Sequence, residues 1–300
     1  MSMDSGFRAQ KICFVGAGSM AEAIIKGLIE QRVALPQDIS VINKQNDERL
    51  QYLQEFYGVA VRTDAASSEQ FLRQADVVVL AMKPKDVHSA CAGIRDFLTH
   101  RPLVISVIAG VSIAVIQQML RIQDGLKSAI PVVRTMPNTS STIGLGMTGM
   151  SFSKEVTEDQ QDLSVDLFEA VGKVSLVAED QLHIVTGMSG SGPAYIYLMM
   201  ESMIAAGCAN GLSESVAREL TVQTILGAAS MVNHTNEEPQ ELRRKVTSPN
   251  GTTQAAIETM QRLGFEDTIL TAITRATERS RELGAALEAQ LEEVPNGGKA

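Results

Sequence analysis

The chain has 300 residues, of which 44% are apolar and 20% charged, with a formal net charge of -9. The length allows two domains, and the composition excludes a disordered or fibrous protein. The negative charge repels phosphate backbones and so disfavours nucleic acid as a partner.

The N-terminal half alternates short apolar runs with amphipathic stretches, the pattern of a parallel sheet built from βαβ units. The runs are apolar on both faces, as expected where helices cover both sides of a sheet. We expect residues 11–178 to form a doubly wound α/β domain, preceded by a disordered segment at 1–10. The expected strands are Lys11–Val15, Ile39–Ile42, Val59–Arg62, Asp76–Met82, Leu103–Ile108, Ile130–Met136, Leu145–Ser151 and Lys173–Val177.

Residues 179–291 change character, because helical spacing replaces strand-like alternation. This part is expected to be an all-helical domain, with Ser213 as the N-cap of one helix. Residues 292–300 are polar and contain glycine, so we expect them to fray. The expected helices are Leu182–Asn210, Ser213–His234, Pro239–Val246, Thr252–Leu263 and Glu266–Gln290.

A glycine-rich turn joins the first strand to the first helix. Gly16 permits a tight turn, Gly18 lets the backbone approach a pyrophosphate, and the small Ala21 lets helix pack closely on strand. Free N–H groups at the helix start then bind negative charge. The sequence predicts a nicotinamide dinucleotide here rather than a ligand-free turn. The cofactor-binding residues of this turn are Gly16, Ala17, Gly18, Ser19, Met20 and Ala21.

The end of the second expected strand bears on the choice of cofactor. An Asp or Glu here binds the ribose 2′-hydroxyl of NAD, but this chain has Asn43 and Lys44, with Arg49 one helical turn on. A neutral residue followed by a cation suits a 2′-phosphate. We therefore expect NADP(H) as the preferred cofactor and NAD(H) as the alternative. The competing interpretation is that Lys44 is a solvated loop charge.

Later segments narrow the function further. They are Leu80-Ala81-Met82-Lys83-Pro84, residues 106–112, Arg134-Thr135-Met136-Pro137-Asn138-Thr139, Gly190-Ser191-Gly192-Pro193-Ala194-Tyr195 and residues 247–253. With the glycine turn, their order and spacing closely resemble the pyrroline-5-carboxylate reductase family, from about Lys11 to Leu283. The Ser-Pro-x-Gly-Thr-Thr element at 248–253 is the most specific part, because generic dinucleotide folds lack it.

The resemblance implies a fold, a reaction and an assembly. The reaction is reduction of 1-pyrroline-5-carboxylate to L-proline by hydride from NAD(P)H, in proline biosynthesis. The fold is a Rossmann-like domain followed by a helical domain that interlocks with its twin. At least a homodimer is implied, with a decamer as the larger alternative.

The resemblance also assigns residues. It places Ala81, Lys83 and Pro84 beside the nicotinamide ribose. It makes Ala109-Gly110 and Met136-Pro137-Asn138-Thr139 the floor between cofactor and substrate. The substrate carboxylate is assigned to the loop from Ser248 to Thr253.

The residues of that loop fit this assignment on physical grounds. Pro249 lacks an N–H and Gly251 tolerates unusual backbone angles, so the loop can turn sharply into a helix. Its N–H groups and the hydroxyls of Ser248, Thr252 and Thr253 then form a carboxylate receptor. The alternative is an ordinary N-capped helix. Thr253 is the candidate for contacting the imine nitrogen or relaying its proton.

Other chemistry-bearing residues are interpreted as structural. His183 lies among apolar neighbours, so we expect a packed or hydrogen-bonded histidine rather than a general acid. We expect no metal, because the histidines have no carboxylates or cysteines at ligand spacing. We expect Cys13 in the core and the methionines of 188–203 in dimer packing. Lacking a secretory signal or membrane span, the chain is expected to be cytoplasmic, with no membrane partner.

Three positions depart from the common family pattern. Ser140 stands where proline is usual, Leu145 where a polar residue is frequent, and Asn250 where the first glycine of Ser-Pro-Gly-Gly is usual. Asn tolerates left-handed backbone angles, so Asn250 is a mild change. The alternatives are a paralogous imine reductase, a 3-hydroxyacid or ketopantoate reductase of the same architecture, and a non-catalytic dinucleotide sensor.

Overall fold

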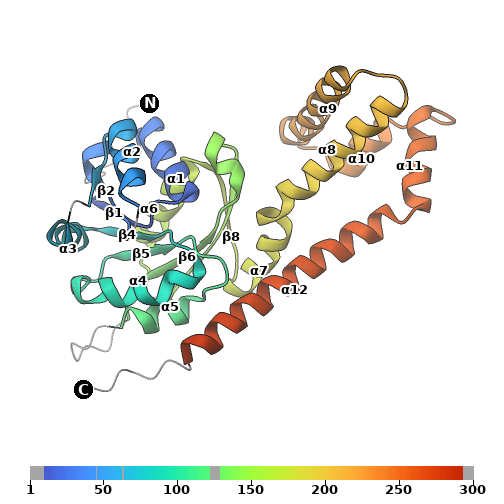
Figure 1. The fold of residues 1–300 in the computed structure, drawn as a ribbon. Helices are drawn as coiled ribbons and strands as arrows, with labels where there is room; N and C mark the ends of the chain where they lie inside the picture. Colours follow the sequence, from blue (N-terminus) through green and yellow to red (C-terminus); the bar gives the residue numbers. More distant parts are fainter. Residues whose placement is uncertain (1–9, 45, 63, 122–128, 293–300) are drawn as a thin grey trace. The chain divides into compact units, whose positions relative to one another are not determined.

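The computed structural model describes residues 10–44, 46–62, 64–121 and 129–292 (Figure 1). The expectations for residues 1–10 and 292–300 thus fall almost wholly outside the described residues. The chain forms two compact units: one extends to Gly190 and resumes at Ala276, and the other is Ser191–Arg275. The predicted domains, 11–178 and 179–291, divide the chain by sequence character. The units divide it by contacts and group residues 179–190 with the sheet.

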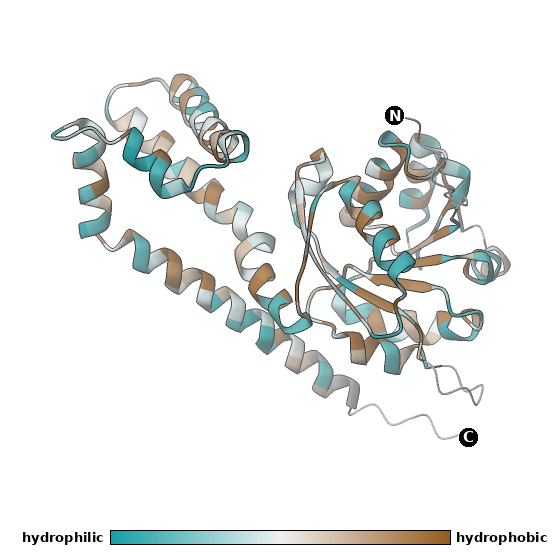
Figure 2. Ribbon diagram, turned by 180° about the vertical axis from the view of Figure 1, so that it is seen from behind, coloured by the Kyte–Doolittle hydropathy of each residue, from teal (hydrophilic) through white to brown (hydrophobic). Residues whose placement is uncertain are grey.

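The first unit contains one sheet of eight strands, and all eight lie where the sequence predicts them. Their order is β3-β2-β1-β4-β5-β6-β7-β8, and neighbours are parallel except for the antiparallel pair β6–β7. Figure 2 shows the apolar character of these strands. The strands are β1 (Ile12–Val15), β2 (Ile39–Ile42), β3 (Ala60–Val61), β4 (Val77–Leu80), β5 (Leu103–Ser106), β6 (Val132–Met136), β7 (Gly146–Phe152) and β8 (Gly172–Leu176).

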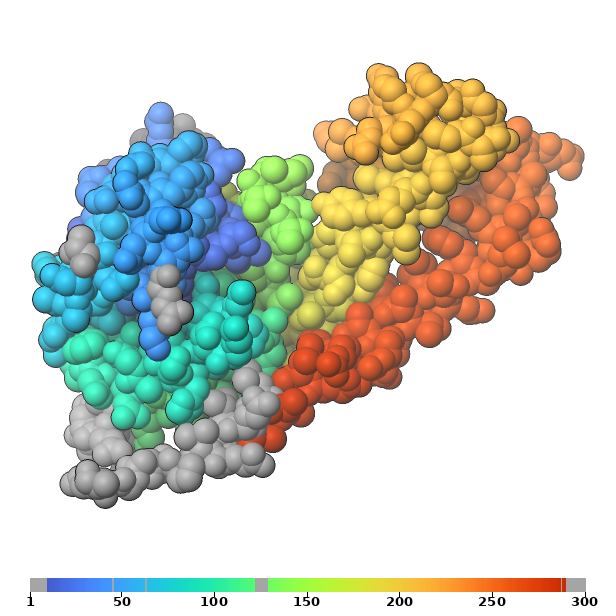
Figure 3. Space-filling model, in the orientation of Figure 1, coloured from blue at the N-terminus to red at the C-terminus, as the bar shows by residue number. Residues whose placement is uncertain are grey.

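Helices cover both faces of this sheet, which confirms the doubly wound prediction. One face receives Leu53 of α2 and Leu167 of α6, and the other receives Cys91 of α4 and Ile116 of α5. Helices α4 and α5 are the turquoise segments at the surface in Figure 3. The helices are α1 (Ser19–Glu30), α2 (Asp47–Tyr57), α3 (Ala65–Gln74), α4 (Val87–Ile94), α5 (Ile113–Met119) and α6 (Glu158–Glu169).

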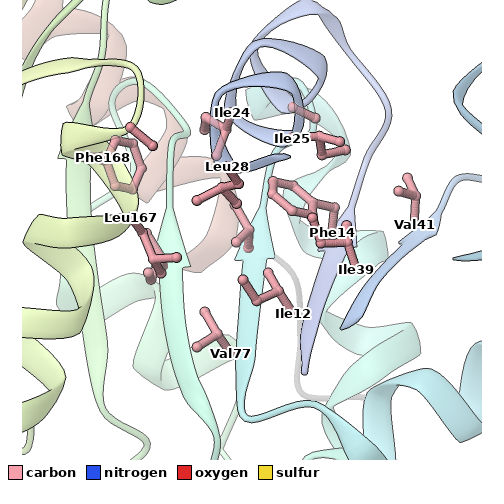
Figure 4. Close-up of a cluster of buried hydrophobic side chains, with 14 of the residues drawn as sticks. Ile12, Phe14, Ile24, Ile25, Leu28, Ile39, Val41, Val77, Leu167 and Phe168 are labelled. Carbon is pink, nitrogen blue, oxygen red and sulfur yellow. The ribbon is translucent and has the colours of Figure 1, made fainter. Parts of the chain in front are cut away.

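Successive side chains of a strand point to opposite faces of the sheet, so one strand contributes to the apolar clusters on both faces. In β1, Ile12 and Phe14 belong to one apolar cluster, and Cys13 and Val15 to the other. Figure 4 shows Phe14 close to the residues of α1. Cys13 is fully buried, as predicted, and burial raises the pKa of its thiol to about 12. Each fully buried large side chain stabilises the fold by about 1.5–3 kcal/mol. Burial on both faces therefore fixes the strand ends that carry the glycine turn.

One predicted helix is interrupted. The sequence predicts a continuous helix over Leu182–Asn210, but the chain forms α7 (Leu182–Val185), a π-helical turn at Thr186–Gly190 and then α8 (Gly192–Ala209). Pro193 explains the break, since proline has no N–H and clashes with the carbonyl four residues before it. The prediction of one helix is wrong for this reason.

The second unit is helical, as predicted, and buries little within one chain. Two residues of α9 are buried and none of α8, α10 or α11, whose residues are all described. Large apolar side chains stay exposed, among them Leu198, Leu226 and Leu263. Ser213 caps α9 as expected. The helices are α9 (Glu214–Thr235), α10 (Pro239–Lys245), α11 (Thr252–Arg262) and the start of α12 (Phe265–Glu292). In the described part of the chain no helix is long and apolar enough to cross a membrane.

Candidate functional site

The glycine turn follows β1, at the point where the strand order reverses: β2 and β3 lie on one side of β1, and β4 lies on the other. Gly16 has φ +111°, and its N–H donates to the carbonyl of Ile42 at 2.8 Å. A Cβ added at Gly16 would lie 2.5 Å from the Ala81 carbonyl oxygen, so only glycine fits. Gly18 is the N-cap of α1 with an extended backbone, and Ala21 is fully buried. The first-turn N–H groups of α1 therefore have no side-chain cap and suit an anion.

An ion pair between Arg49 and Glu22 lies next to this turn and contacts its backbone. The Arg49 guanidinium binds the Glu22 carboxylate and donates through Nε to the Ala17 carbonyl at 2.9 Å. Burial pushes the pKa of Glu22 upward, but Arg49 and the hydroxyls of Tyr57 and Tyr52 outweigh it and lower that pKa. Arg49 is thus a brace for the turn and not a cation facing the second strand end, which corrects its placement with Lys44.

The carboxyl ends of β1 to β6 all reach the same edge of the sheet, because these strands are parallel. This edge brings together the sequence-predicted residues of the first unit. Ala81 follows β4, and Gly110, with φ +81°, follows β5. Lys83 and Pro84 are exposed after β4, as is Ala109 after β5.

Asn138 follows β6 at this edge, and its amide is already engaged. Its nitrogen donates to the backbone oxygen and to the hydroxyl of Ser189, both at 3.3 Å, and its oxygen accepts from the N–H of Met147 at 3.2 Å. These contacts tie the end of β6 to the π-helical turn and to β7.

The Gly110 turn packs on the last helix. A Cβ at Gly284 would lie 3.0 Å from the Gly110 carbonyl oxygen and 3.5 Å from the ring of His183. His183 pairs through Nδ1 with the Ser280 hydroxyl at 2.9 Å, which confirms the hydrogen-bonded structural histidine. Ser112 donates to Glu288 at 2.7 Å. The second half of α12 therefore supports the turn after β5.

The environment of His183 predicts a pH dependence of stability. Burial, followed by the charges of Arg134 and Arg281, lowers its pKa from the usual 6.5. The unfolded chain thus takes up the proton first as the pH falls, so the free energy of unfolding decreases below about pH 6.5. We expect the free energy of unfolding of His183→Gln, measured with urea, to decrease less than that of the wild type between about pH 7.5 and about pH 5.5. The control is His88→Gln, at an exposed position of α4. Parallel profiles for His183→Gln and wild type would remove His183 from this account.

A pocket of about 550 Å³ opens beside the glycine turn. Gly16, Asn43 and Lys44 line it, as do Arg62 and Met82. The sequence-based assignment includes the first three residues and misses the other two. Arg62 ends the third predicted strand, so the rule that ligands bind at carboxyl strand ends provides the signal that could have found it.

The loop predicted to bind a carboxylate lies in the second unit. Asn250 has φ +57°, the left-handed conformation that asparagine tolerates, and its N–H donates to the Gln254 side chain at 2.7 Å. Gly251 is the N-cap of α11, and its own N–H donates to the Ser248 carbonyl at 3.0 Å. Like α1, this helix starts at a glycine with an extended backbone. Its first-turn N–H groups, beside Thr252 and Thr253, have no side-chain cap.

The histidine, cysteine and acidic side chains of the described residues bear on metal and thiol chemistry. Among them, no group of three or more histidine, cysteine or acidic side chains is arranged to hold a metal ion. Cys91 is fully buried, and burial raises the pKa of its thiol to about 12, so it is a poor nucleophile at neutral pH.

Both units match known families. Residues 179–283 match the family described as pyrroline-5-carboxylate reductase dimerisation. Residues 11–110 match the family described as NADP oxidoreductase coenzyme F420-dependent. The chain therefore contains a domain of the pyridine-nucleotide-binding kind at residues 11–110 and a dimerisation domain at residues 179–283.

Relatives cover nearly the whole chain. The chain is 40% identical over 282 residues to pyrroline-5-carboxylate reductase 1 of Bacillus spizizenii, covering 94% of this chain and 92% of the relative. It superposes with a TM-score of 0.84 on the pyrroline-5-carboxylate reductase of Coxiella burnetii, at 38% identity over 92% of this chain and 99% of that one. The NADP-bound enzyme of Plasmodium falciparum gives 0.79 at 28% identity, over 93% and 100%. The chain belongs to the pyrroline-5-carboxylate reductase family.

Proposed function

We propose that this chain reduces 1-pyrroline-5-carboxylate to L-proline with a nicotinamide dinucleotide. The observation that carries the proposal is the similarity at 40% identity over 94% of the chain to an enzyme named for this reaction. The regions that match family models, residues 11–110 and 179–283, contain the glycine turn and the loop before α11.

The residues of the first unit fit the cofactor. Gly16 allows the tight turn in which an added Cβ would clash with the Ala81 backbone, and the start of α1 supplies N–H donors for a phosphate. When bound, the nicotinamide supplies the hydride. The residues that would hold the dinucleotide are Gly16, Ala17, Gly18, Ser19, Met20, Ala21, Asn43, Lys44, Ala81, Lys83, Pro84, Ala109, Gly110 and Asn138. Asn138 keeps the floor in place through Ser189 and Met147.

The loop before α11 would hold the substrate carboxylate. Backbone N–H groups at the start of a helix bind anions, and here the N-cap is Gly251, which offers no competing acceptor. The hydroxyls of Ser248, Thr252 and Thr253 add donors. With these donors the site needs no arginine to bind a carboxylate. The net charge of -9 repels anions, so the attraction must come from donors at the site itself.

Reduction of the imine needs little acid catalysis from the protein. Once the imine nitrogen is protonated, the imine carbon is electrophilic, so positioning matters more than a strong acid. Thr253 would contact the nitrogen and relay its proton. The preference is for NADP(H) through Lys44, with NAD(H) as the weaker cofactor, and the working assembly is a homodimer.

A substrate panel tests the proposal. We expect the wild-type chain to oxidise NADPH with 1-pyrroline-5-carboxylate, forming L-proline, and to leave ketopantoate and 3-oxoacids unreduced. Turnover of either of those instead of the cyclic imine would assign the chain to another reductase. Absence of turnover with all of them, with either cofactor, would support a sensor.

A further inference from the structure

Arg62 stands at the edge of the sheet that carries the glycine turn. Val61 pairs with Val41 in the parallel register, and the N–H of Arg62 donates to the Val41 carbonyl at 3.0 Å. This places Arg62 next to the end of β2, which Asn43 follows directly in the chain. Arg62 and Lys44 line the same pocket as Gly16. Two cations from different strand ends thus border one side of a dinucleotide pocket.

The guanidinium of Arg62 is only partly satisfied. One terminal nitrogen binds the Asp47 carboxylate at 2.8 Å, while Nε is buried and has no hydrogen-bond partner in the described chain. The Arg62 side chain is 24% exposed and that of Asp47 is 88% exposed. An ion pair with so exposed a carboxylate contributes little to stability and is readily exchanged. A buried donor without an acceptor is costly, so a movement of this side chain that brings the N–H to an acceptor would be favourable.

We propose that Arg62, together with Lys44, binds the adenosine 2′-phosphate of NADP and thereby determines the preference for NADP over NAD. A phosphate monoester offers three acceptor oxygens, and the planar guanidinium presents parallel donors that match two of them. The Lys44 ammonium adds a second positive charge to the same pocket. Because the inference rests on the proposed function, its test must separate the two.

A competing role for Arg62 makes a different prediction. A guanidinium can also stack on the face of an adenine ring. Stacking would stabilise NAD and NADP equally, since both contain adenine, whereas a 2′-phosphate contact affects NADP alone. The ratio of the two dissociation constants therefore distinguishes the roles.

The experiment measures binding by calorimetry, with no turnover required. The probes are NADP+, NAD+, 2′,5′-ADP and 5′-AMP, and the variants are Arg62→Gln, Arg62→Lys and Asp47→Asn. We expect Arg62→Gln to raise the dissociation constants of NADP+ and 2′,5′-ADP by roughly tenfold to a hundredfold, because one or two charge-assisted hydrogen bonds are lost. The dissociation constants of NAD+ and 5′-AMP should change by less than about twofold. Arg62→Lys keeps the charge but not the paired donors, so its loss should be intermediate.

Asp47→Asn is the matched control, because it breaks the same ion pair from the other side. If Arg62 served only to hold the start of α2, both variants would weaken NADP+ alike. We expect Asp47→Asn to leave NADP+ binding unchanged or tighter. Thermal unfolding of each variant checks that the chain is folded.

The remaining outcomes are distinct. Equal losses for NAD+ and NADP+ in Arg62→Gln, or no loss for NADP+, would overturn the role of Arg62 while wild-type turnover of the imine keeps the proposed function. A wild-type chain that binds neither dinucleotide would overturn the proposed function, and the inference with it.

Discussion

Gly16→Ala is expected to abolish dinucleotide binding while the chain still folds. The added Cβ would lie 2.5 Å from the Ala81 carbonyl oxygen and 3.0 Å from the Met82 nitrogen, both backbone atoms that cannot rotate away. The turn must therefore shift, together with the helix start that is proposed to hold the pyrophosphate. We expect NADP+ to bind at least about a hundredfold more weakly, or about 2.7 kcal/mol.

Gly58→Ala is the control for Gly16→Ala, because it imposes a similar backbone strain without the clash. Gly58 has φ +71° at the end of α2, and the nearest atom to an added Cβ is Pro36 Cβ at 3.6 Å, an ordinary contact. This variant should lose about 1 kcal/mol of stability and retain NADP+ binding. If both variants bind NADP+ as the wild type does, the glycine turn is not the pyrophosphate site.

Thr253→Val is expected to lower kcat by roughly tenfold to a hundredfold at saturating NADPH. This is at or below the lower end of the about 10²–10⁴-fold that a general acid or base contributes, because a protonated imine needs little acid catalysis. Valine preserves the shape of threonine and removes its hydroxyl, so α11 should persist. The dissociation constant for NADP+ should not change, because Thr253 is assigned to the substrate.

Thr259→Val, on the same helix, is the control for Thr253→Val. The Thr259 hydroxyl donates to the Ala255 carbonyl at 2.9 Å and is exposed, so its loss should leave kcat unchanged. An unchanged rate in Thr253→Val would remove that hydroxyl from the mechanism. A rise in KM at constant kcat would instead make Thr253 a substrate-binding group without a part in proton transfer.

The features that the sequence predicts well depend on near neighbours in the chain. Strands β1, β2, β4 and β5 are short, largely apolar runs in which every residue is buried, so local hydrophobicity is enough to predict them. The turn at Gly16 and the left-handed Asn250 follow from the backbone angles that these residues tolerate. Ser213 caps α9 because its hydroxyl can accept from the N–H three residues on.

The features that the sequence does not reveal depend on contacts between distant residues. Arg49 is close to Lys44 in sequence, yet its guanidinium reaches Glu22 and the Ala17 carbonyl. Arg62 comes beside the end of β2 only through the register of a strand 20 residues on. The contact of Asn138 with Ser189 spans 51 residues. Side-chain direction and strand order decide all three, and neither is encoded locally.

The central claim is direct reduction of the cyclic imine by the dinucleotide, and isotope transfer tests it most directly. The wild-type chain is incubated with 1-pyrroline-5-carboxylate and NADPH carrying deuterium at both positions of nicotinamide C4. We expect L-proline with one deuterium at C5, the former imine carbon, in an amount equal to the NADPH consumed. Formation of unlabelled proline, or consumption of NADPH without proline, would contradict it.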